Sequence, residues 1–213
     1  MATTVTYKGA TLTTVDNQTK VLETAGTWME DDLTLVDVSG GGGWTTDGIA
    51  TNAEPNGVIT LGSIEVGAFA LAKKTAITSL SGSVTQVLEN AFNGCSSLTS
   101  ISFPNMTGQF QQAAARDCKN LTFVDLGGCT QINNTAFQNA NALSTLVLRR
   151  TSVCTLQNVQ AFVNTPIRGY GGGSGEIYVP ESLISTYQGA SNWSSIYSEG
   201  HVTFKKIEGS IYE

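Results

Sequence analysis

The sequence predicts a mainly β protein with short helical turns, in which a leucine-rich-repeat solenoid of about five coils follows a small β module. Two observations predict this fold. An Ala-Phe type pair followed by a Leu-x-x-Ile-x-Phe type run recurs, with copies starting at Ala91, Ala114, Ala136 and Ala161. These starts are 22 to 25 residues apart, a period typical of leucine-rich repeats, in which each coil holds one strand and one helical or looser turn. The first 38 residues carry no copy, so we assign them to a separate module.

Residues 1–38 are predicted to form this small β module. Val5–Leu12 indicates two strands joined by a Lys-Gly turn, and Leu33–Val38 indicates a closing strand. Four glycines follow at Gly40–Gly43, and their lack of side chains favours a flexible hinge. We therefore place a domain boundary here and assign residues 39–58 to the hinge and the N-terminal cap of the array.

Residues 59–180 are predicted to form the solenoid. In each copy the apolar positions of the run point into the coil, and stacking places each one on its counterpart in the next coil. A degenerate copy at Ala68-Phe69 precedes the clear ones, with Leu80 in the place of Ile101. The array therefore starts before its clearest copy.

The phenylalanines of the repeated pair are expected in the core rather than in a ligand site, because burying such a ring contributes about 1.5–3 kcal/mol. They are Phe92, Phe137 and Phe162. The second copy has Ala115 instead of Phe. Phe110 or Phe123 must fill that volume, or a cavity remains.

The four cysteines allow two disulfides, a metal site or a purely structural role. Cys95 and Cys118 occupy the same place in successive copies, where the third copy has Ala140. Such a position favours a small, buried, weakly polar side chain. The sequence has no Cys-x-x-Cys and a single histidine, which argues against a zinc site of the usual ligand spacing. We therefore favour the structural role.

The fourth copy is interrupted by a glycine-rich insertion at Arg168–Gly175. Insertions in repeat proteins tend to form loops on one face, often the binding face. Residues 181–213 are then predicted to form a C-terminal cap. Glu181–Tyr187 suits a short helix, and the aromatic and aliphatic residues that follow supply an apolar lid for the last coil.

Composition argues against several functions. Charged residues make up 13% of the chain and the formal net charge is −6, which is unfavourable for binding a nucleic-acid backbone. No segment approaches the ~20 apolar residues that span a bilayer, so we expect no membrane insertion. Met1–Val5 has neither a basic stretch nor an apolar run, so no secretory signal is predicted.

Catalytic chemistry is also hard to place in this sequence. Gly-x-Ser-x-Gly is absent, and His201 is the only imidazole, in a polar turn where a solvated histidine is expected. Glu30–Asp32 lacks the spacing of a calcium loop and is typical of a solvated turn. We expect no enzyme activity, no cofactor and no metal.

Candidate binding residues lie between the repeated positions. The outward-facing strand residues line one face in successive coils, and an arginine doublet and the insertion lie near them. Phe123 and Val147 are apolar where water is expected, a mixture compatible with a recognition surface or with packing inside an assembly. The predicted surface consists of Ser100, Ser102, Phe123, Asp125, Thr145, Val147, Arg149, Arg168 and Tyr170.

The pattern of Ala91–Pro104 resembles the BspA-type leucine-rich repeats of bacterial surface and phage-associated proteins. The resemblance covers roughly residues 59–180. It implies a solenoid that binds proteins or surfaces.

The phrases Tyr7–Gly9, Ala25–Met29 and Asp31–Leu35 are similar to small modules that open tail, baseplate and fibre proteins of phages. This second resemblance implies a fibre or decoration component of a virion tail or head. Residues 1–38 would then attach to other virion proteins, with a homotrimer as one arrangement, and the array would face a host-surface glycan or protein. A bacterial cell-surface adhesion protein is the alternative, and an accessory module of a carbohydrate-active enzyme is a third reading.

Overall fold

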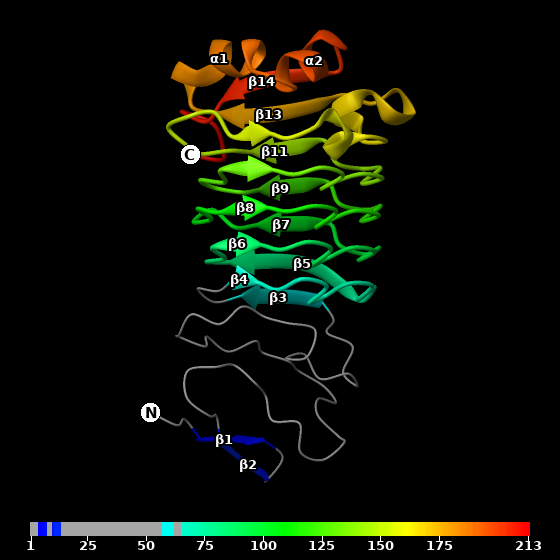
Figure 1. Cartoon of the computed structure of the whole chain (residues 1–213), viewed down its shortest axis with the longest axis vertical. Helices are drawn as coiled ribbons and strands as arrows, with labels where there is room; N and C mark the ends of the chain where they lie inside the picture. The colour runs from blue at the N-terminus through cyan, green and yellow to red at the C-terminus, as the bar shows by residue number, and fades with distance from the viewer. Residues whose placement is uncertain (1–3, 8–9, 14–56, 62–64) are drawn as a thin grey trace.

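The computed structural model describes residues 4–7, 10–13, 57–61 and 65–213, and its main body is a β-solenoid (Figure 1). The coils stack on one another and form two parallel sheets. Each coil from β3–β4 (Gly57–Leu61 and Glu65–Val66) to β11–β12 (Thr145–Val147 and Thr155–Leu156) gives one strand to each sheet. The predicted leucine-rich-repeat solenoid is confirmed.

The larger sheet has seven strands and the smaller one five. The larger sheet follows the order of the chain, and its other strands are β5 (Ile77–Gly82), β7 (Ser100–Ser102), β9 (Phe123–Asp125), β13 (Gly175–Val179) and β14 (Val202–Lys206). The smaller sheet is completed by β6 (Gln86–Val87), β8 (Gln109–Phe110) and β10 (Gln131–Ile132).

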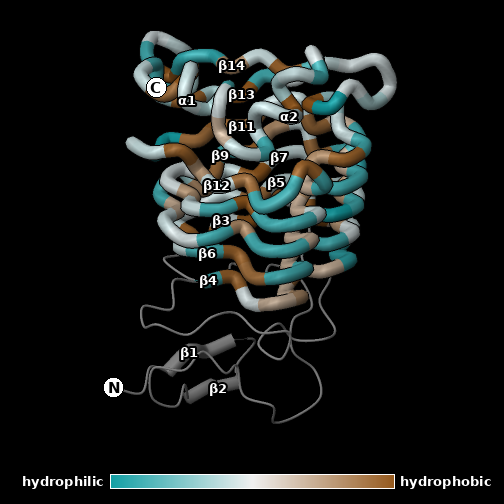
Figure 2. The backbone as a smooth tube through the Cα atoms, turned by 45° about the horizontal axis from the view of Figure 1, so that its top comes forward, coloured by the Kyte–Doolittle hydropathy of each residue, from teal (hydrophilic) through white to brown (hydrophobic). Residues whose placement is uncertain are grey.

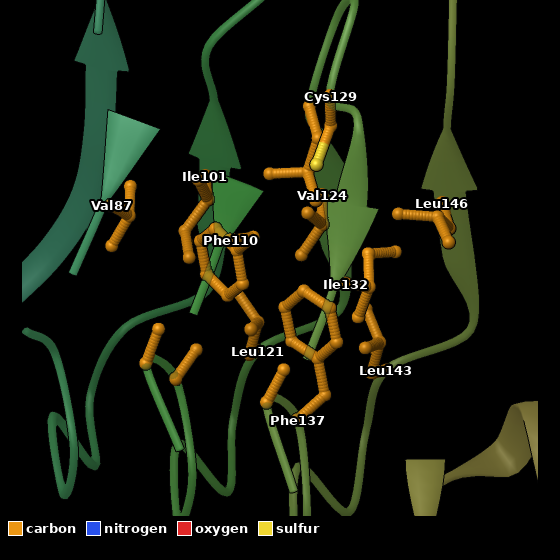
Figure 3. Packing of buried hydrophobic residues seen from close by; sticks show 14 of the residues in the cluster. Val87, Ile101, Phe110, Leu121, Val124, Cys129, Ile132, Phe137, Leu143 and Leu146 are labelled. Carbon is orange, nitrogen blue, oxygen red and sulfur yellow. The ribbon is translucent and has the colours of Figure 1, made fainter. Parts of the chain in front are cut away.

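The core lies between the two sheets (Figure 3). Hydrophobic and hydrophilic segments alternate along the coils and recur from coil to coil (Figure 2). Because parallel pairing keeps equivalent residues in register, each buried side chain packs on its counterpart in the next coil. The register column of the larger sheet is Leu80, Ile101, Val124, Leu146 and Ile177, and all five are fully buried.

The Ala-Phe positions form the remaining wall of the core. Phe92, Phe137 and Phe162 are fully buried, which confirms their predicted role. Phe137 packs against Phe162 with ring centroids 5.5 Å apart, and Phe162 packs against Trp193 at 6.0 Å. The aromatic column thus runs from the repeats into the C-terminal cap.

The degenerate first copy is shifted relative to the prediction. Leu71 N donates to Ala91 O at 2.8 Å, as Phe92 N does to Ala114 O at 2.7 Å in the next coil. Leu71, not Phe69, is therefore the counterpart of Phe92. Phe69 is 47% exposed and has a φ of 59°, so the prediction of Ala68-Phe69 as the repeated pair is wrong by two residues. The predicted pairing of Leu80 with Ile101 is confirmed.

The cysteines are buried as free thiols, in agreement with the structural role. Cys95 Sγ donates to Leu71 O at 3.0 Å, and Cys118 Sγ donates to Phe92 O at 3.2 Å, so each thiol satisfies a carbonyl of the preceding coil. In the fourth copy, Thr165 Oγ1 donates to Phe162 O at 2.8 Å. The position therefore takes a small buried side chain, which donates a hydrogen bond in three copies and is Ala140 in the third.

Short helices flank β13, and those that follow it close the end of the solenoid. The 3-10 helices η1 (Val159–Phe162), η2 (Pro166–Arg168) and η3 (Tyr170–Gly172) precede β13, and η4 (Glu181–Leu183), α1 (Ile184–Gly189) and α2 (Trp193–Ser198) follow it. Most of the expected apolar lid is present, because Trp193, Ile196, Val202, Phe204 and Ile207 are buried together with Tyr187, whereas Tyr197, which was also expected in the lid, is 40% exposed. No helix in the described part of the chain is long and apolar enough to cross a membrane.

An antiparallel pair of strands is described before the solenoid. β1 (Thr4–Tyr7) pairs with β2 (Ala10–Thr13), with Val5 opposite Leu12, as predicted for the start of the β module. The Lys-Gly turn, the closing strand at Leu33–Val38, the Gly40–Gly43 hinge and the carboxylates of Glu30–Asp32 lie outside the described residues.

Candidate recognition surface

The outward face of the seven-stranded sheet carries two parallel columns of side chains. Side chains alternate between the faces of a strand, so the residues on either side of each buried strand centre point outward. The first column is Ser79, Ser100, Phe123, Thr145, Glu176 and Thr203, and the second is Ser81, Ser102, Asp125, Val147, Tyr178 and Lys205. The six predicted strand residues thus lie together on one face.

The first coils present a row of hydroxyl groups on this face. Ser79 Oγ lies 2.8 Å from Ser100 Oγ, and Thr60 Oγ1 lies 3.3 Å from Ser81 Oγ. The serines are partly exposed, and a hydroxyl is both a donor and an acceptor. Because the side chains are small and the strands about 4.8 Å apart, this part offers closely spaced polar groups close to the backbone.

The later coils of the same face are covered by residues 207–213, here called the strap. Ile207 N donates to Val179 O at 3.0 Å, and the chain then ends beside the solenoid, level with β11 (Figure 1). The Tyr212 ring stacks on Phe123 at 5.4 Å and meets the Tyr178 ring edge-on at 4.6 Å. Arg149 Nη1 donates to Tyr212 O. The strap therefore fills an aromatic slot between β9 and β13.

An ion pair lies beside this slot. Arg149 Nη2 is 2.7 Å from Asp125 Oδ2, and Gly127 N donates to Asp125 Oδ1 at 2.9 Å. Asp125 is 3% exposed, and Val147, which follows it in the column, is fully buried. The expectation that Asp125 and Val147 face water is wrong, because the chain's own segments cover the later part of the face.

Four of the predicted strand residues remain accessible, and three of these are polar: Ser100, Ser102 and Thr145 are partly exposed. Phe123 is partly exposed beside Tyr212, and Arg149 keeps 29% of its side chain exposed although it is paired with Asp125.

The two residues of the insertion lie in the short helices before β13, not on the strands themselves. Arg168 ends η2 and forms a two-point contact with Glu199, with Nε 2.9 Å from Oε2. Tyr170 starts η3 and is 46% exposed. A Cβ added to Gly169 would lie 2.6 Å from the ring of His201, so only glycine fits this turn. His201 itself is exposed, as expected.

Sequence reasoning missed the residues that complete the face. Tyr178 and Glu176 could have been found by aligning Ile177 with Leu146, because they flank that buried position in β13. Tyr178 Oη donates to Glu176 Oε2 at 2.8 Å, and hydrogen bonds from Lys205 and then from Tyr178 hold the pKa of Glu176 below its usual value. Tyr212 lies outside every repeat, so no alignment of repeated positions could have placed it on this face.

A metal-binding cluster is not found in the described residues, where no three His, Cys, Asp or Glu side chains come together.

The model of the BspA type leucine-rich repeat region matches residues 57–169 with six copies, more than half of the chain. The chain belongs to the BspA-type leucine-rich repeat family. A comparison with curated proteins gives no match. Repeats of this family suggest a protein-interaction or adhesion domain, and the solenoid is typical of a non-enzymatic binding scaffold.

Proposed function

We propose that this BspA-type protein is a non-enzymatic structural component of a phage virion, a fibre or decoration protein of tail or head. Its solenoid would display the outward face of the seven-stranded sheet to a host-surface molecule or another protein. The observation that carries the recognition role is the regular row of accessible hydroxyls at Thr60, Ser79, Ser81, Ser100 and Ser102.

The rigidity of the scaffold favours such a role. The strands from β5 to β13 are paired on both sides within the larger sheet, with β3 and β14 at its edges, and the side chains in their central column are fully buried. A surface that is already ordered loses little conformational entropy when a ligand binds, so weak polar contacts add up to useful affinity. The acidic chain, with a net charge of −6, remains a poor partner for nucleic acid.

The virion part of the proposal is supported by the N-terminal resemblance. The phrases within residues 7–35 are similar to modules that open phage tail, baseplate and fibre proteins, and the pairing of β1 with β2 agrees with a β module. We assign attachment to other virion proteins to residues 1–38.

Location is tested by mass spectrometry of density-purified virions, with the envelope of uninfected host cells as the matched control. We expect the protein in the virions at a level comparable to other structural components. Detection in the cell envelope alone would replace the virion role by that of a bacterial surface adhesion protein.

Recognition is tested by binding of the labelled chain to host cells. Ser100→Arg places a long charged side chain in the hydroxyl row and should reduce binding at least tenfold. Gln109→Arg makes the same change in charge on the other sheet and should bind as the wild type does. Equal binding of the two variants would remove the hydroxyl row from the proposal.

A further inference from the structure

We propose that the slot filled by Tyr212 is a docking site for a polypeptide segment that carries an aromatic side chain, and that the strap is its intramolecular competitor. This inference rests on the proposed recognition function, since it extends the same face. The strap shows which chemistry the slot accepts.

The slot is built from two aromatic rings. Phe123 offers its face at 5.4 Å and 25° from the plane of the Tyr212 ring, while Tyr178 approaches at 4.6 Å and 72°. Stacked and edge-to-face geometries are the two favoured arrangements of aromatic pairs, each contributing about 0.5–1.5 kcal/mol beyond the buried area. A tyrosine or phenylalanine of another chain would find the same two contacts.

The slot also recognises the main chain of its occupant. Arg149 donates to the carbonyl of Tyr212, while its Nε and Nη2 are held by the buried carboxylate of Asp125. The guanidinium is thereby fixed with one N–H aimed at a peptide carbonyl. A carbonyl acceptor next to an aromatic side chain is available in any peptide that contains an aromatic residue, which makes such a polypeptide the matching class of partner.

Besides Tyr212, the strap is held by Ile207, by Glu208, whose Oε2 accepts a hydrogen bond from Glu181 N at 2.9 Å, and by its own turns. Ser210 N donates to Ile207 O at 2.9 Å, and Tyr212 N donates to Ser210 Oγ at 3.1 Å. Ile211, next to Tyr212, is 90% exposed. Lifting Tyr212 would leave the columns of the inner core, such as Val124 and Leu146, closed by the sheet.

Displacement of the strap would join the two parts of the face. Ser100 neighbours Phe123 in the first column, and Ser102 neighbours Asp125 in the second. An aromatic peptide seated in the slot would therefore continue over the hydroxyl row. The exposed hydroxyl row and the slot that the strap now covers would then form one continuous recognition surface.

The test uses a fluorescent synthetic peptide with the sequence of residues 206–213 as the probe, titrated by anisotropy against the full chain and its Tyr212→Ala variant. A tethered strap acts at an effective concentration on the order of mM, so it should weaken binding of the free peptide. The apparent affinity falls with the fraction of open sites, and we expect Tyr212→Ala to bind at least about tenfold more tightly than the wild type.

Matched variants make the result specific to the slot. Ile211→Ala changes an exposed neighbour and should bind the probe as weakly as the wild type. In the Tyr212→Ala background, Phe123→Ser should abolish binding, while Phe69→Ser, the same change at an exposed phenylalanine of the first coil, should not. A probe whose own tyrosine is replaced by alanine should not bind.

Equal binding by the wild type and Tyr212→Ala, or none by Tyr212→Ala up to about 1 mM peptide, would overturn the proposal. A glycan that binds Tyr212→Ala where the peptide does not would overturn the choice of partner. These outcomes are independent of the virion test, because they use the isolated chain and a defined peptide.

Discussion

The ring of Phe110 stacks on the ring of Phe137, with centroids 4.9 Å apart and planes 12° from parallel (Figure 3). Phe110 comes from β8, whereas Phe137 belongs to the repeated pair of the next coil. The repeated pair of the second copy has Ala115, whose N donates to Ala136 O as Phe92 N does to Ala114 O. Phe110 therefore supplies the ring that Ala115 lacks, and Phe123, which faces outward, does not.

Phe110→Ala should lower the free energy of unfolding by about 3–5 kcal/mol. The coil already has Ala115 in place of the repeated phenylalanine, so the variant would leave this part of the core without any ring. Ala115→Phe alone should cost about 1–3 kcal/mol through overpacking. If the two positions share one volume, the double variant will be more stable than the sum of the single effects predicts. Urea denaturation of all four proteins measures this, and additive losses would show that the volumes are separate.

The repeat makes the core predictable from sequence, because positions that recur in register must pack on one another. Phe92, Phe137 and Phe162, the small cysteine position and the pairing of Leu80 with Ile101 all follow from this rule. The first copy was misplaced because its Leu71 replaces the expected phenylalanine, while a phenylalanine stands two residues earlier at an exposed turn.

The candidate surface was predictable only in part. Alternation along the strands places Ser100, Ser102 and Thr145 on the outward face. The strap does not belong to the repeat, so the period of the repeat does not predict where it lies. Its signal was indirect: Phe123 and Val147 are apolar at outward positions, which indicates a cover, and the cover comes from unrepeated residues around Tyr212. Contacts made by segments outside a repeat cannot be read from its period.

Asp125→Asn should lower the free energy of unfolding by about 1.5–3 kcal/mol, the range for hydrogen bonds to charged groups, because Arg149 would lose its charged partner. Chemical denaturation measures the loss. The matched control is Glu181→Gln, which removes the partner of Lys206 in a pair whose side chains are 63% and 54% exposed, and should cost less than about 1 kcal/mol. Equal effects of the two variants would contradict the assigned role of the buried carboxylate.

Tyr187→Phe should loosen the cap. The Tyr187 hydroxyl accepts a hydrogen bond from Cys154 N at 2.8 Å, and Trp193 Nε1 donates to Cys154 O at 2.7 Å. The cap therefore binds both the N–H and the C=O of Cys154. Removing the hydroxyl leaves a buried N–H without an acceptor, at a cost of about 1–3 kcal/mol. Thermal unfolding followed by circular dichroism checks the loss. Tyr197→Phe, at a 40% exposed ring, serves as control and should unfold at nearly the wild-type temperature.

Alkaline pH should destabilise the protein through its buried thiols. Burial raises the pKa of Cys95 from 9.0 to about 12, so between these values the unfolded chain loses a proton that the folded chain keeps. The contribution of Cys95 to stability is therefore fully present below about pH 9 and declines by about 1.4 kcal/mol per pH unit towards about pH 12.

The variant Cys95→Ala tests this, because alanine already occupies the equivalent position at Ala140. It should reduce the slope of the unfolding free energy against pH by that amount. Urea titrations at several pH values from about 8 to 11 measure both slopes. Parallel curves for the wild type and Cys95→Ala would mean that this thiol ionises as readily in the folded protein as in the unfolded chain.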